Sequence, residues 1–279
     1  MVFIIAEIGT NHTGSIDIAK KIIDLVVQEG CDAVKFQKKN VEKIYTKEFL
    51  DSPIYSPWGT SQREMRLHRE FSDKQFNSIN TYCKKKKIPW FVSCWDTESQ
   101  LQMRKFKTKF NKVASAMLIH EELLKLIAEE KKKTFISTGM STIKEIKTAV
   151  DIFRKADCPF ELMHSNSSYP TKPAEANLKM IQTLKRKFHC SVGYSGHESS
   201  ASAISLAAVF LGATSIERHV TIERTMYGYD QAASLGPDGL HRLVSSIRLL
   251  ENKDIWGDGI KRIYRSEHTN MKKLRQKFV

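Results

Sequence analysis

Eight short apolar runs, separated by segments with helical spacing, restrict the fold of this chain more than any other feature. The runs lie at residues 2–5, 33–36, 89–92, 112–114, 134–136, 160–163, 191–194 and 215–217. The segments with helical spacing lie at residues 16–27, 73–83, 98–106, 121–129, 143–156, 174–184, 201–211 and 237–250. Short apolar runs that alternate with amphipathic helices predict a parallel sheet. Eight such repeats in 279 residues favour a closed (β/α)8 TIM barrel, an α/β fold.

Local signals support these boundaries. Thr142 precedes Glu145 by three residues, which is the spacing of a capping box at a helix N-terminus. Gly30 and Gly212 each close a helical segment just before a predicted strand. The stretch 38–71 is too long for a simple connection, so we expect a functional loop there. We expect a single barrel domain over residues 1–279, with the polar tail after Glu251 ending it.

Composition and charge exclude several classes of protein. The net charge of +14 could indicate a nucleic-acid partner, but the lysines are dispersed. Their two short runs, at 84–87 and 131–133, lie where helices are predicted to end, so we expect an anionic small substrate and no nucleic acid. No apolar run is long enough to span a membrane, and no secretory signal is visible. Five cysteines without paired spacing indicate free thiols, and together these features predict a cytoplasmic protein.

Two histidines follow neighbouring apolar runs near the end of the predicted barrel. His197 and His219 are separated by about one helix, and each lies beside a carboxylate, Glu198 or Glu217. A single histidine is usually a structural residue, but the C-terminal ends of parallel strands gather at one edge of a barrel. We therefore expect the two imidazoles to lie side by side, where they could share one divalent metal ion.

Other predicted strands also end in polar or charged residues. Lys35 and Gln37 alternate and so share one face, and Lys112 lies on another strand. Buried lysines are rare without a partner, so these two predict bound anions. Hydroxyl groups and glycine amides at Ser115, Ser195 and the turn 137–139 are typical of a phosphate site. Together the strand ends predict a site for a phosphorylated, carboxylated small molecule and a metal ion.

The chain resembles the sialic acid synthases, the phosphoenolpyruvate-condensing enzymes that make N-acetylneuraminate and related nonulosonic acids. The motifs that carry the resemblance follow one another along nearly the whole chain, at the predicted strand ends. They are Ala6-Glu7-Ile8-Gly9, Val34-Lys35-Phe36-Gln37, Lys112-Val113-Ala114-Ser115, Ser137-Thr138-Gly139-Met140, Tyr169-Pro170, the stretch from Gly193 to His197, and Ile216-Glu217-Arg218-His219.

The resemblance implies a metal-dependent condensation. Phosphoenolpyruvate adds through C3 to the aldehyde of an open-chain N-acetylated hexosamine, water attacks C2, and phosphate leaves. His197 and His219 would hold the divalent ion, which is typically Mn²⁺, with Mg²⁺ or Co²⁺ as alternatives. The expected phosphate ligands are Lys112, Ser115, Ser137, Gly139 and Ser195. Lys35 would meet the carboxylate, and the other substrate contacts are expected from Gln37, Ser167, Tyr169 and Asp230. The catalytic candidates are Glu7, Glu217 and Lys112.

The chain departs from the family pattern at three positions. Met117 stands where many relatives have an acidic residue, Gly196 where an aspartate is common, and Cys94 where a threonine is common. We expect the first to cost a sugar contact, the second to remove a carboxylate behind the metal, and the third to weaken a hydroxyl contact. We also expect no C-terminal antifreeze-like domain, which in relatives supplies an arginine to the partner subunit's sugar site. The 38–71 loop could close the site instead.

Two alternatives remain at this stage. One is another phosphoenolpyruvate-dependent sugar-acid synthase, such as the octulosonate type, which takes phosphorylated sugars. The other is a catalytically idle barrel that binds a sugar. Within the resemblance, the sugar could be N-acetylmannosamine, its 6-phosphate or a diamino sugar. A homodimer is implied by the resemblance alone.

Overall fold

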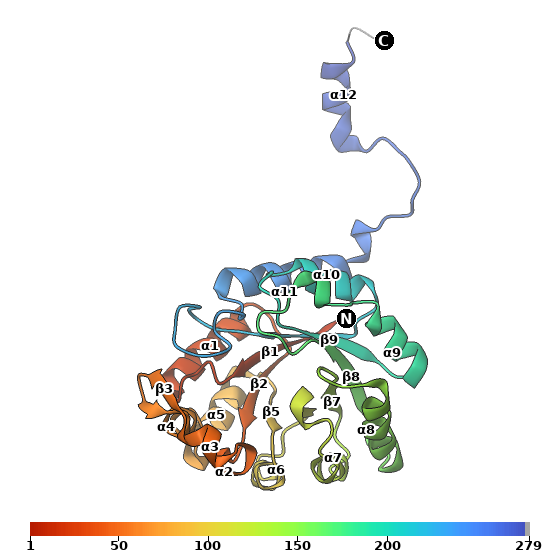
Figure 1. The fold of residues 1–279 in the computed structure, drawn as a ribbon. Coiled ribbons are helices and arrows are strands. Elements are labelled where there is room, and N and C mark those ends of the chain that lie inside the picture. The colour runs from red at the N-terminus through yellow and green to blue at the C-terminus, as the bar shows by residue number, and fades with distance from the viewer. Residues whose placement is uncertain (277–279) are drawn as a thin grey trace. The chain divides into compact units, whose positions relative to one another are not determined.

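The fold is a closed barrel of eight parallel strands, as the sequence predicts. The structure is a computed structural model that describes residues 1–276. The strands close in the order β1-β10-β9-β8-β7-β6-β5-β2 (Figure 1). They are β1 Phe3–Gly9, β2 Ala33–Lys38, β5 Trp90–Cys94, β6 Asn111–Val113, β7 Thr134–Ser137, β8 Phe160–Ser165, β9 Val192–Gly196 and β10 Ser215–His219. Every apolar run identified in the sequence lies in one of these strands or overlaps it.

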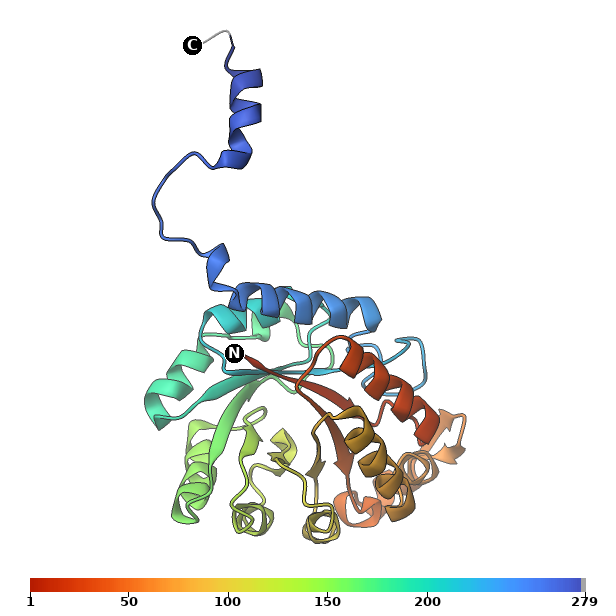
Figure 2. The ribbon, with the colours of Figure 1, turned by 180° about the vertical axis from the view of Figure 1, so that it is seen from behind.

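Helices cover the outside of the strands in both views (Figure 1 and Figure 2). They are α1 Ile16–Gln28, α5 Asp73–Lys86, α6 Thr97–Arg104, α7 Glu121–Ala128, α8 Ile143–Lys155, α9 Met180–Phe188, α10 Ala203–Phe210 and α11 Pro237–Glu251. Only α9 begins well after its predicted start. The 3-10 turn η2, Pro173–Glu175, occupies the predicted first turn, and Asn177 with φ +42° then breaks the helical path.

The predicted helix ends are confirmed. Thr142 caps α8 by accepting from the Glu145 amide, and the Glu145 side chain accepts from the Thr142 amide, which completes the capping box. Gly30 and Gly212 adopt φ +77° and +94°, a backbone conformation that glycine adopts without steric cost. These glycines turn the chain from α1 into β2 and from α10 into β10.

An apolar layer fills the N-terminal end of the barrel. Ile5, Ala33, Phe91, Phe135 and Met163 form one buried cluster, with the Phe91 and Phe135 rings 5.8 Å apart. Side chains two residues apart on a strand point to the same side. The residues two positions further along these strands are Glu7, Lys35, Ser93, Ser137 and Ser165. Each strand therefore places a polar group directly above an apolar one, at the C-terminal mouth of the barrel.

The 38–71 insertion is folded. It consists of α2 Val41–Ile44, α3 Lys47–Asp51, the hairpin β3 Pro53–Ser56 and β4 Gly59–Ser61, and α4 Gln62–His68. It contacts the loop 220–236 that follows β10, because the Tyr227 hydroxyl donates to the Tyr55 carbonyl at 2.7 Å. The Trp58 and Tyr227 rings also pack edge to face, with centroids 5.4 Å apart. These contacts join two loops at the mouth of the barrel.

The chain divides into two compact units. Met1–Ile247 forms the barrel, and a shorter unit begins at Arg248 and contains the helix α12, His268–Leu274. The last three residues of the domain predicted over 1–279 lie outside the described residues. Within residues 1–276, no helix combines the length and apolar character needed to cross a bilayer. Within the barrel unit, all the cysteines are free thiols.

The α8 capping box can be tested by removing its hydroxyl group. We expect Thr142→Ala to lower the free energy of unfolding by about 1 kcal/mol, because the Glu145 amide loses its acceptor at the helix start. Thr148→Ala, in the middle of the same helix, is the matched control, and we expect little change or a slight gain. Urea unfolding of both variants measures the difference, and equal losses would show that the cap contributes nothing.

Candidate active site

Most of the predicted site residues line one cavity of about 160 Å³ at the barrel mouth. They are Glu7, Lys35, Gln37, Lys112, Ser115, Ser137, Ser167, Tyr169, Ser195, His197, Glu217 and His219. Gly139 contributes its backbone amide to the same hydroxyl groups. Asp230 is the exception, because it lines a neighbouring cavity that shares Gln37, Trp95 and Tyr169 with this one.

Two carboxylates and two ammonium groups form a buried network at the cavity floor. Lys35 Nζ lies 2.9 Å from Glu7 Oε2 and 3.5 Å from Glu217 Oε1. Lys112 Nζ lies 3.1 Å from Glu217 Oε2. All four side chains are at most 6% exposed. Strand register explains the meeting, since Glu7 is paired with Lys35 across β1 and β2, and Glu217 lies on β10 beside β1.

The network shifts the pKa of its members. Burial and the nearby Lys35 lower the pKa of Lys112, Glu217 opposes them, and the net result is a pKa of about 8. Burial also disfavours the charged Glu217, but Lys112 and Lys35 outweigh it and lower the Glu217 pKa to about 2. Burial also disfavours the charged form of Lys35, but Glu217 and Glu7 outweigh this effect and raise the Lys35 pKa. Glu217 is therefore ionised near neutral pH, and Lys112 is the ammonium group that loses its proton most easily.

A cluster of hydroxyl groups from Ser115 and Ser165 surrounds the Gly139 amide, which lies in the turn that follows β7. The Gly139 amide donates to Ser115 Oγ at 3.1 Å and to Ser165 Oγ at 3.0 Å, and these two oxygens lie 3.2 Å apart. A Cβ at residue 139 would lie 2.3 Å from Ser167 Oγ, so a larger residue would displace the hydroxyl groups. Hydroxyl groups and an amide gathered beside an ammonium group are suited to a phosphate.

His197 and His219 lie side by side, as predicted from their strands. Their ring centroids are 5.6 Å apart, and the Tyr169 ring lies 4.1 Å from that of His197. His197 Nδ1 lies 2.6 Å from the Asn166 carbonyl oxygen, which can only accept, so this nitrogen carries the hydrogen. His197 Nε2 then accepts from the Tyr169 hydroxyl at 3.0 Å. Burial lowers the pKa of His197 to about 3, and His219 adds to the effect, so the imidazole is neutral.

The two imidazoles can supply two ligands to a divalent ion. Histidines that bind metals usually donate their second nitrogen to a carbonyl or carboxylate, as His197 does to Asn166. The buried Nδ1 of His219 has no hydrogen-bond partner within residues 1–276. No group of three or more His, Cys, Asp or Glu side chains in that part of the chain forms a metal cage. The donor set fits an ion that takes its other ligands from substrate and water.

Glu198 does not belong to the cavity, although it follows His197 directly. It pairs with Arg218 behind the strands at 2.8 Å and accepts from the Tyr194 hydroxyl at 3.0 Å. A Cβ at Gly196 would lie 2.5 Å from the Glu198 carboxylate and 2.7 Å from the Tyr194 ring. The glycine that departs from the family pattern is therefore required by this buried ion pair.

The other two departures also have structural contexts. Cys94 is buried in the apolar core between strands and helices, whereas Ser93 faces the cavity. A threonine at position 94 would face the same core, so the cysteine removes no hydroxyl group from the cavity. Met117 lies in the 3-10 turn η1, Ser115–Met117, and packs against the same core.

Sequence reasoning missed several residues that shape the site. Ser165 was detectable, because it precedes Ser167 by two residues and so shares its side of the chain. Lys39 continues the alternation of Lys35 and Gln37 beyond the end of β2. Asn166 acts through its backbone carbonyl, which leaves no side-chain signal in a sequence.

Known proteins resemble this chain over most of its length. The sequence profile of the NeuB family matches residues 22–261. The N-acetylneuraminate-9-phosphate synthase of Mus musculus is 36% identical over 252 residues, covering 89% of this chain and 70% of the mouse protein. The N,N'-diacetyllegionaminic acid synthase of Campylobacter jejuni is 35% identical, and the match covers 99% of this chain and 84% of the Campylobacter protein. The solved N-acetylneuraminic acid synthetase of Leptospira borgpetersenii has a TM-score of 0.82 and 33% identity, covering 99% of this chain and 92% of that one.

The anion site can be tested with sulfate, which stays a dianion across the relevant pH range. The folded-state pKa of Lys112 is lowered to about 8, so its charge is present below that pH and lost above it. We expect sulfate affinity to fall about tenfold between about pH 7 and about pH 9. Isothermal titration calorimetry measures the change. We expect Lys112→Met to remove this step and Lys125→Met, at an exposed helix position, to keep it. A step of the same size in both variants would exclude Lys112 as its source.

Proposed function

Because the chain belongs to the NeuB family, we propose that it is a nonulosonic acid synthase. It condenses phosphoenolpyruvate with the aldehyde of an open-chain N-acetylated hexosamine and releases phosphate. Among the observations, the arrangement of the barrel mouth supports this function best. One cavity holds two lysines, a hydroxyl cluster and two adjacent buried imidazoles. An anionic donor and a carbonyl acceptor can therefore meet there.

Phosphoenolpyruvate fits the anion-binding half of the cavity. Its phosphate lies against Lys112, Ser115, Ser137, Ser195 and the Gly139 amide. Its carboxylate meets Lys35. Binding between these groups fixes C3 towards the histidines and leaves C2 close to the carboxylates. Holding both reacting molecules in one orientation removes much of the entropic cost of a bimolecular step.

The carbon–carbon bond forms when C3 attacks the aldehyde carbon, and the aldehyde oxygen takes up a proton from water to become a hydroxyl group. C2 is left electron-poor, and a water oxygen adds to it while the water proton moves to a carboxylate. Glu217 is ionised, so it can accept this proton but has none to donate near neutral pH. Glu7 is the second candidate. Its Oε2 lies 2.9 Å from Lys35 Nζ, and its Oε1 accepts from Gln37 Nε2 at 2.9 Å.

Phosphate leaves when the tetrahedral intermediate collapses. The bond between C2 and the bridging oxygen breaks, the C2 hydroxyl group gives its proton to water, C2 becomes the keto carbon, and negative charge grows on the phosphate. Lys112 is placed to stabilise this charge and to donate a proton, since its pKa of about 8 lies close to neutral pH. We therefore count Lys112 with Glu7 and Glu217 among the catalytic residues.

A divalent metal ion, Mn²⁺ first and Mg²⁺ or Co²⁺ as alternatives, completes the proposal. His197 and His219 would hold it, and it would make the aldehyde more electrophilic as a Lewis acid. The charge balance supports it. Glu7 and Glu217 cancel the charges of Lys35 and Lys112, so a substrate with several negative charges enters a site with no excess positive charge. Two further proposals, a homodimer and a cytoplasmic location, rest on the family resemblance and the composition.

Two other functions remain distinguishable by experiment. Another phosphoenolpyruvate-dependent sugar-acid synthase would use a phosphorylated aldose without the acetamido group. An idle sugar-binding barrel would release no phosphate with any sugar. The ionised Glu217 beside two ammonium groups favours an active enzyme, because a buried charge network is costly to keep without use. Phosphate release from phosphoenolpyruvate, with Mn²⁺ and a panel of N-acetylated hexosamines and phosphorylated aldoses, decides among the three.

The metal assignment can be tested with a histidine variant. We expect His219→Ala to lose nearly all Mn²⁺-dependent phosphate release and to bind Mn²⁺ at least tenfold more weakly. Its circular dichroism should match the wild type, because the barrel core is unchanged. His241→Ala, at an exposed position on α11, is the control and should keep both properties. Normal turnover of His219→Ala in chelator-treated buffer would contradict the assignment.

A further inference from the structure

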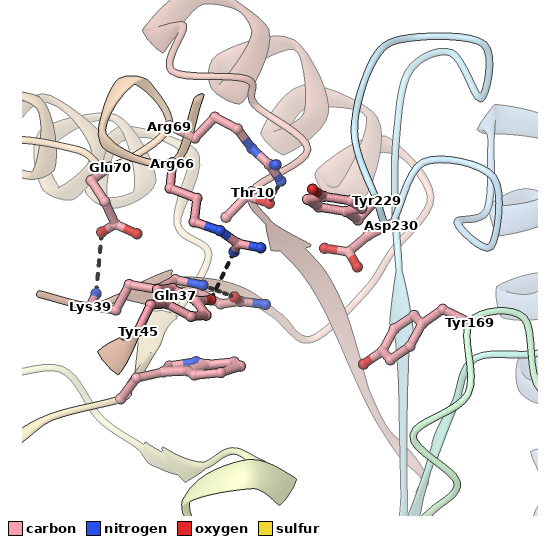
Figure 3. Close-up of a pocket in the computed structure, with 11 residues that line it drawn as sticks. Thr10, Gln37, Lys39, Tyr45, Arg66, Arg69, Glu70, Tyr169, Tyr229 and Asp230 are labelled. Carbon is pink, nitrogen blue, oxygen red and sulfur yellow. Dashed lines mark hydrogen bonds between the residues drawn. The ribbon is translucent and has the colours of Figure 1, made fainter. Parts of the chain in front are cut away.

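A second cavity, of about 180 Å³, adjoins the active-site cavity. Gln37, Trp95 and Tyr169 line both. Its other walls come from the insertion and from the loop after β10, and Figure 3 shows the Arg66 and Arg69 side chains approaching it from one side and Asp230 from the other. A sugar that reaches from the histidines past Tyr169 would therefore extend into this second cavity.

Three cations line the second cavity, and within residues 1–276 none of them has a carboxylate oxygen at ion-pair distance. Lys39 Nζ donates to Gln37 Oε1 at 3.4 Å and lies over the Trp95 ring. Arg66 donates to the Tyr45 hydroxyl at 2.8 Å. Arg69 donates to the Thr10 hydroxyl and to Met65 Sδ. Their polar partners are neutral.

Burial makes this arrangement costly. Lys39 and Arg69 are only 8% and 6% exposed. The buried Nε atoms of Arg66 and Arg69 and the Nε1 of Trp95 have no hydrogen-bond partner within the described part of the chain. Burial lowers the pKa of Lys39, and the nearby Glu70 and Asp230 oppose this effect only in part. Buried cations without counterions are rare unless a ligand supplies the negative charge.

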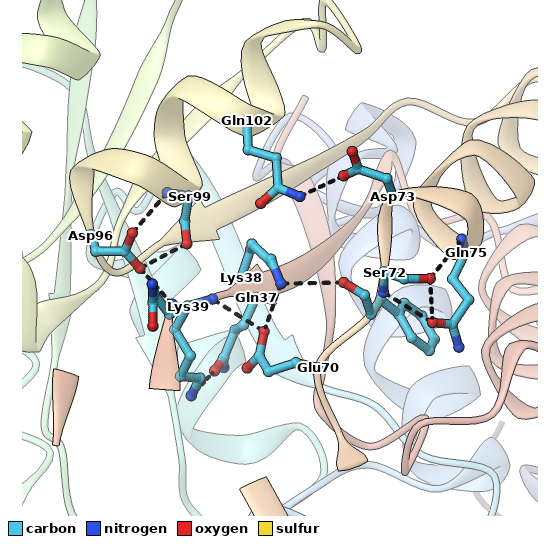
Figure 4. Close-up of polar contacts among 12 residues, drawn as sticks. Gln37, Lys38, Lys39, Glu70, Ser72, Asp73, Gln75, Asp96, Ser99 and Gln102 are labelled. Atoms are coloured by element: carbon cyan, nitrogen blue, oxygen red, sulfur yellow. Dashed lines mark hydrogen bonds and ion pairs between the residues drawn. The ribbon is translucent and has the colours of Figure 1, made fainter. Parts of the chain in front are cut away.

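The nearby carboxylates do not balance the three cations. Glu70 is engaged elsewhere, because its Oε2 accepts from Lys38 Nζ at 3.5 Å and from the Lys39 amide at 3.2 Å (Figure 4). Asp230 is the other carboxylate that lines the cavity. Three positive charges therefore face one available negative charge, whereas the network at the active-site floor is balanced.

We propose that this second cavity binds a phosphate group on the amino sugar, at the end remote from the aldehyde. The inference rests on the proposed function and names its substrate class, a phosphorylated N-acetylated hexosamine. A neutral sugar would leave the cations uncompensated, whereas a phosphate dianion balances the excess charge. Guanidinium groups match phosphate oxygens in pairs, and Lys39 adds a third contact. The names of the relatives leave the point open, since only one of the two describes a phosphorylated product.

The test compares N-acetylmannosamine with N-acetylmannosamine 6-phosphate. Consumption of phosphoenolpyruvate with Mn²⁺ gives kcat/KM for each sugar. We expect the wild type to prefer the phosphorylated sugar at least tenfold. We expect Arg66→Gln to reduce that preference by about 10- to 100-fold, mainly through KM, because a charge-assisted contact to the phosphate is lost. Arg66→Lys should restore part of the preference.

Arg63→Gln is the matched control. Arg63 lies one turn earlier on α4, and its ion pairs are with Glu42 and Asp51, outside the cavity. We expect this variant to keep the wild-type preference. Lys39→Met provides a second, independent variant if Arg66→Gln fails to fold, and it should shift the preference in the same direction. A wild type that prefers the unphosphorylated sugar, or variants that leave the preference unchanged, would overturn the proposal.

A binding measurement separates this proposal from the proposed function. N-acetylmannosamine 6-phosphate is titrated calorimetrically into the wild type, Arg66→Gln and Arg63→Gln. If the enzyme consumes no phosphoenolpyruvate with either sugar, the proposed synthase function is wrong. The subsite is then judged by binding alone. Binding that Arg66→Gln weakens at least tenfold and Arg63→Gln retains supports the phosphate subsite. No binding, or equal binding in all three proteins, overturns it.

Discussion

The ion network of Glu7, Lys35, Glu217 and Lys112 is the constraint on which the site depends. Removing such charges from water costs several kcal/mol for each ion, and only mutual pairing offsets the cost. Their close contacts, at 2.9 to 3.5 Å, require strands in fixed register and a floor that excludes water. The aromatic and aliphatic layer around Ile5, Phe91 and Phe135 provides that floor. The same balance leaves Lys112 with a pKa of about 8, so the structural network also prepares a proton donor.

Two neighbouring cavities differ in how their charges are compensated. The active-site cavity holds equal numbers of carboxylates and ammonium groups, and its excess donors are hydroxyl groups and an amide. The second cavity holds Lys39, Arg66 and Arg69 with neutral partners. The insertion supplies five of the eleven residues that line it and touches the loop after β10 through Tyr227. Through this contact, the insertion and the loop after β10 together cover one side of the barrel mouth.

The sequence predicted the barrel and most of the cavity because both follow from local patterns. Each strand was visible as an apolar run, and the site residues lie two positions beyond inward-facing apolar ones, as Glu7 follows Ile5 and Ser137 follows Phe135. Other features gave weaker signals or none. Arg66 lies on α4 and Arg69 directly follows that helix, and nothing local shows that they face a cavity. The Asn166 carbonyl that fixes the His197 tautomer has no side-chain signature.

The sequence itself determined the order and direction of the strands, the capping box of α8 and the alternation that points polar residues to the mouth. Steric periodicity and local hydrogen bonds decide these features. Which charges neutralise one another was decided only by the tertiary structure. Glu198 follows His197 in the chain but pairs with Arg218 behind the sheet, and Glu217 joins two lysines from distant strands. Electrostatic energy depends on distance and burial, and neither is fixed until the barrel closes.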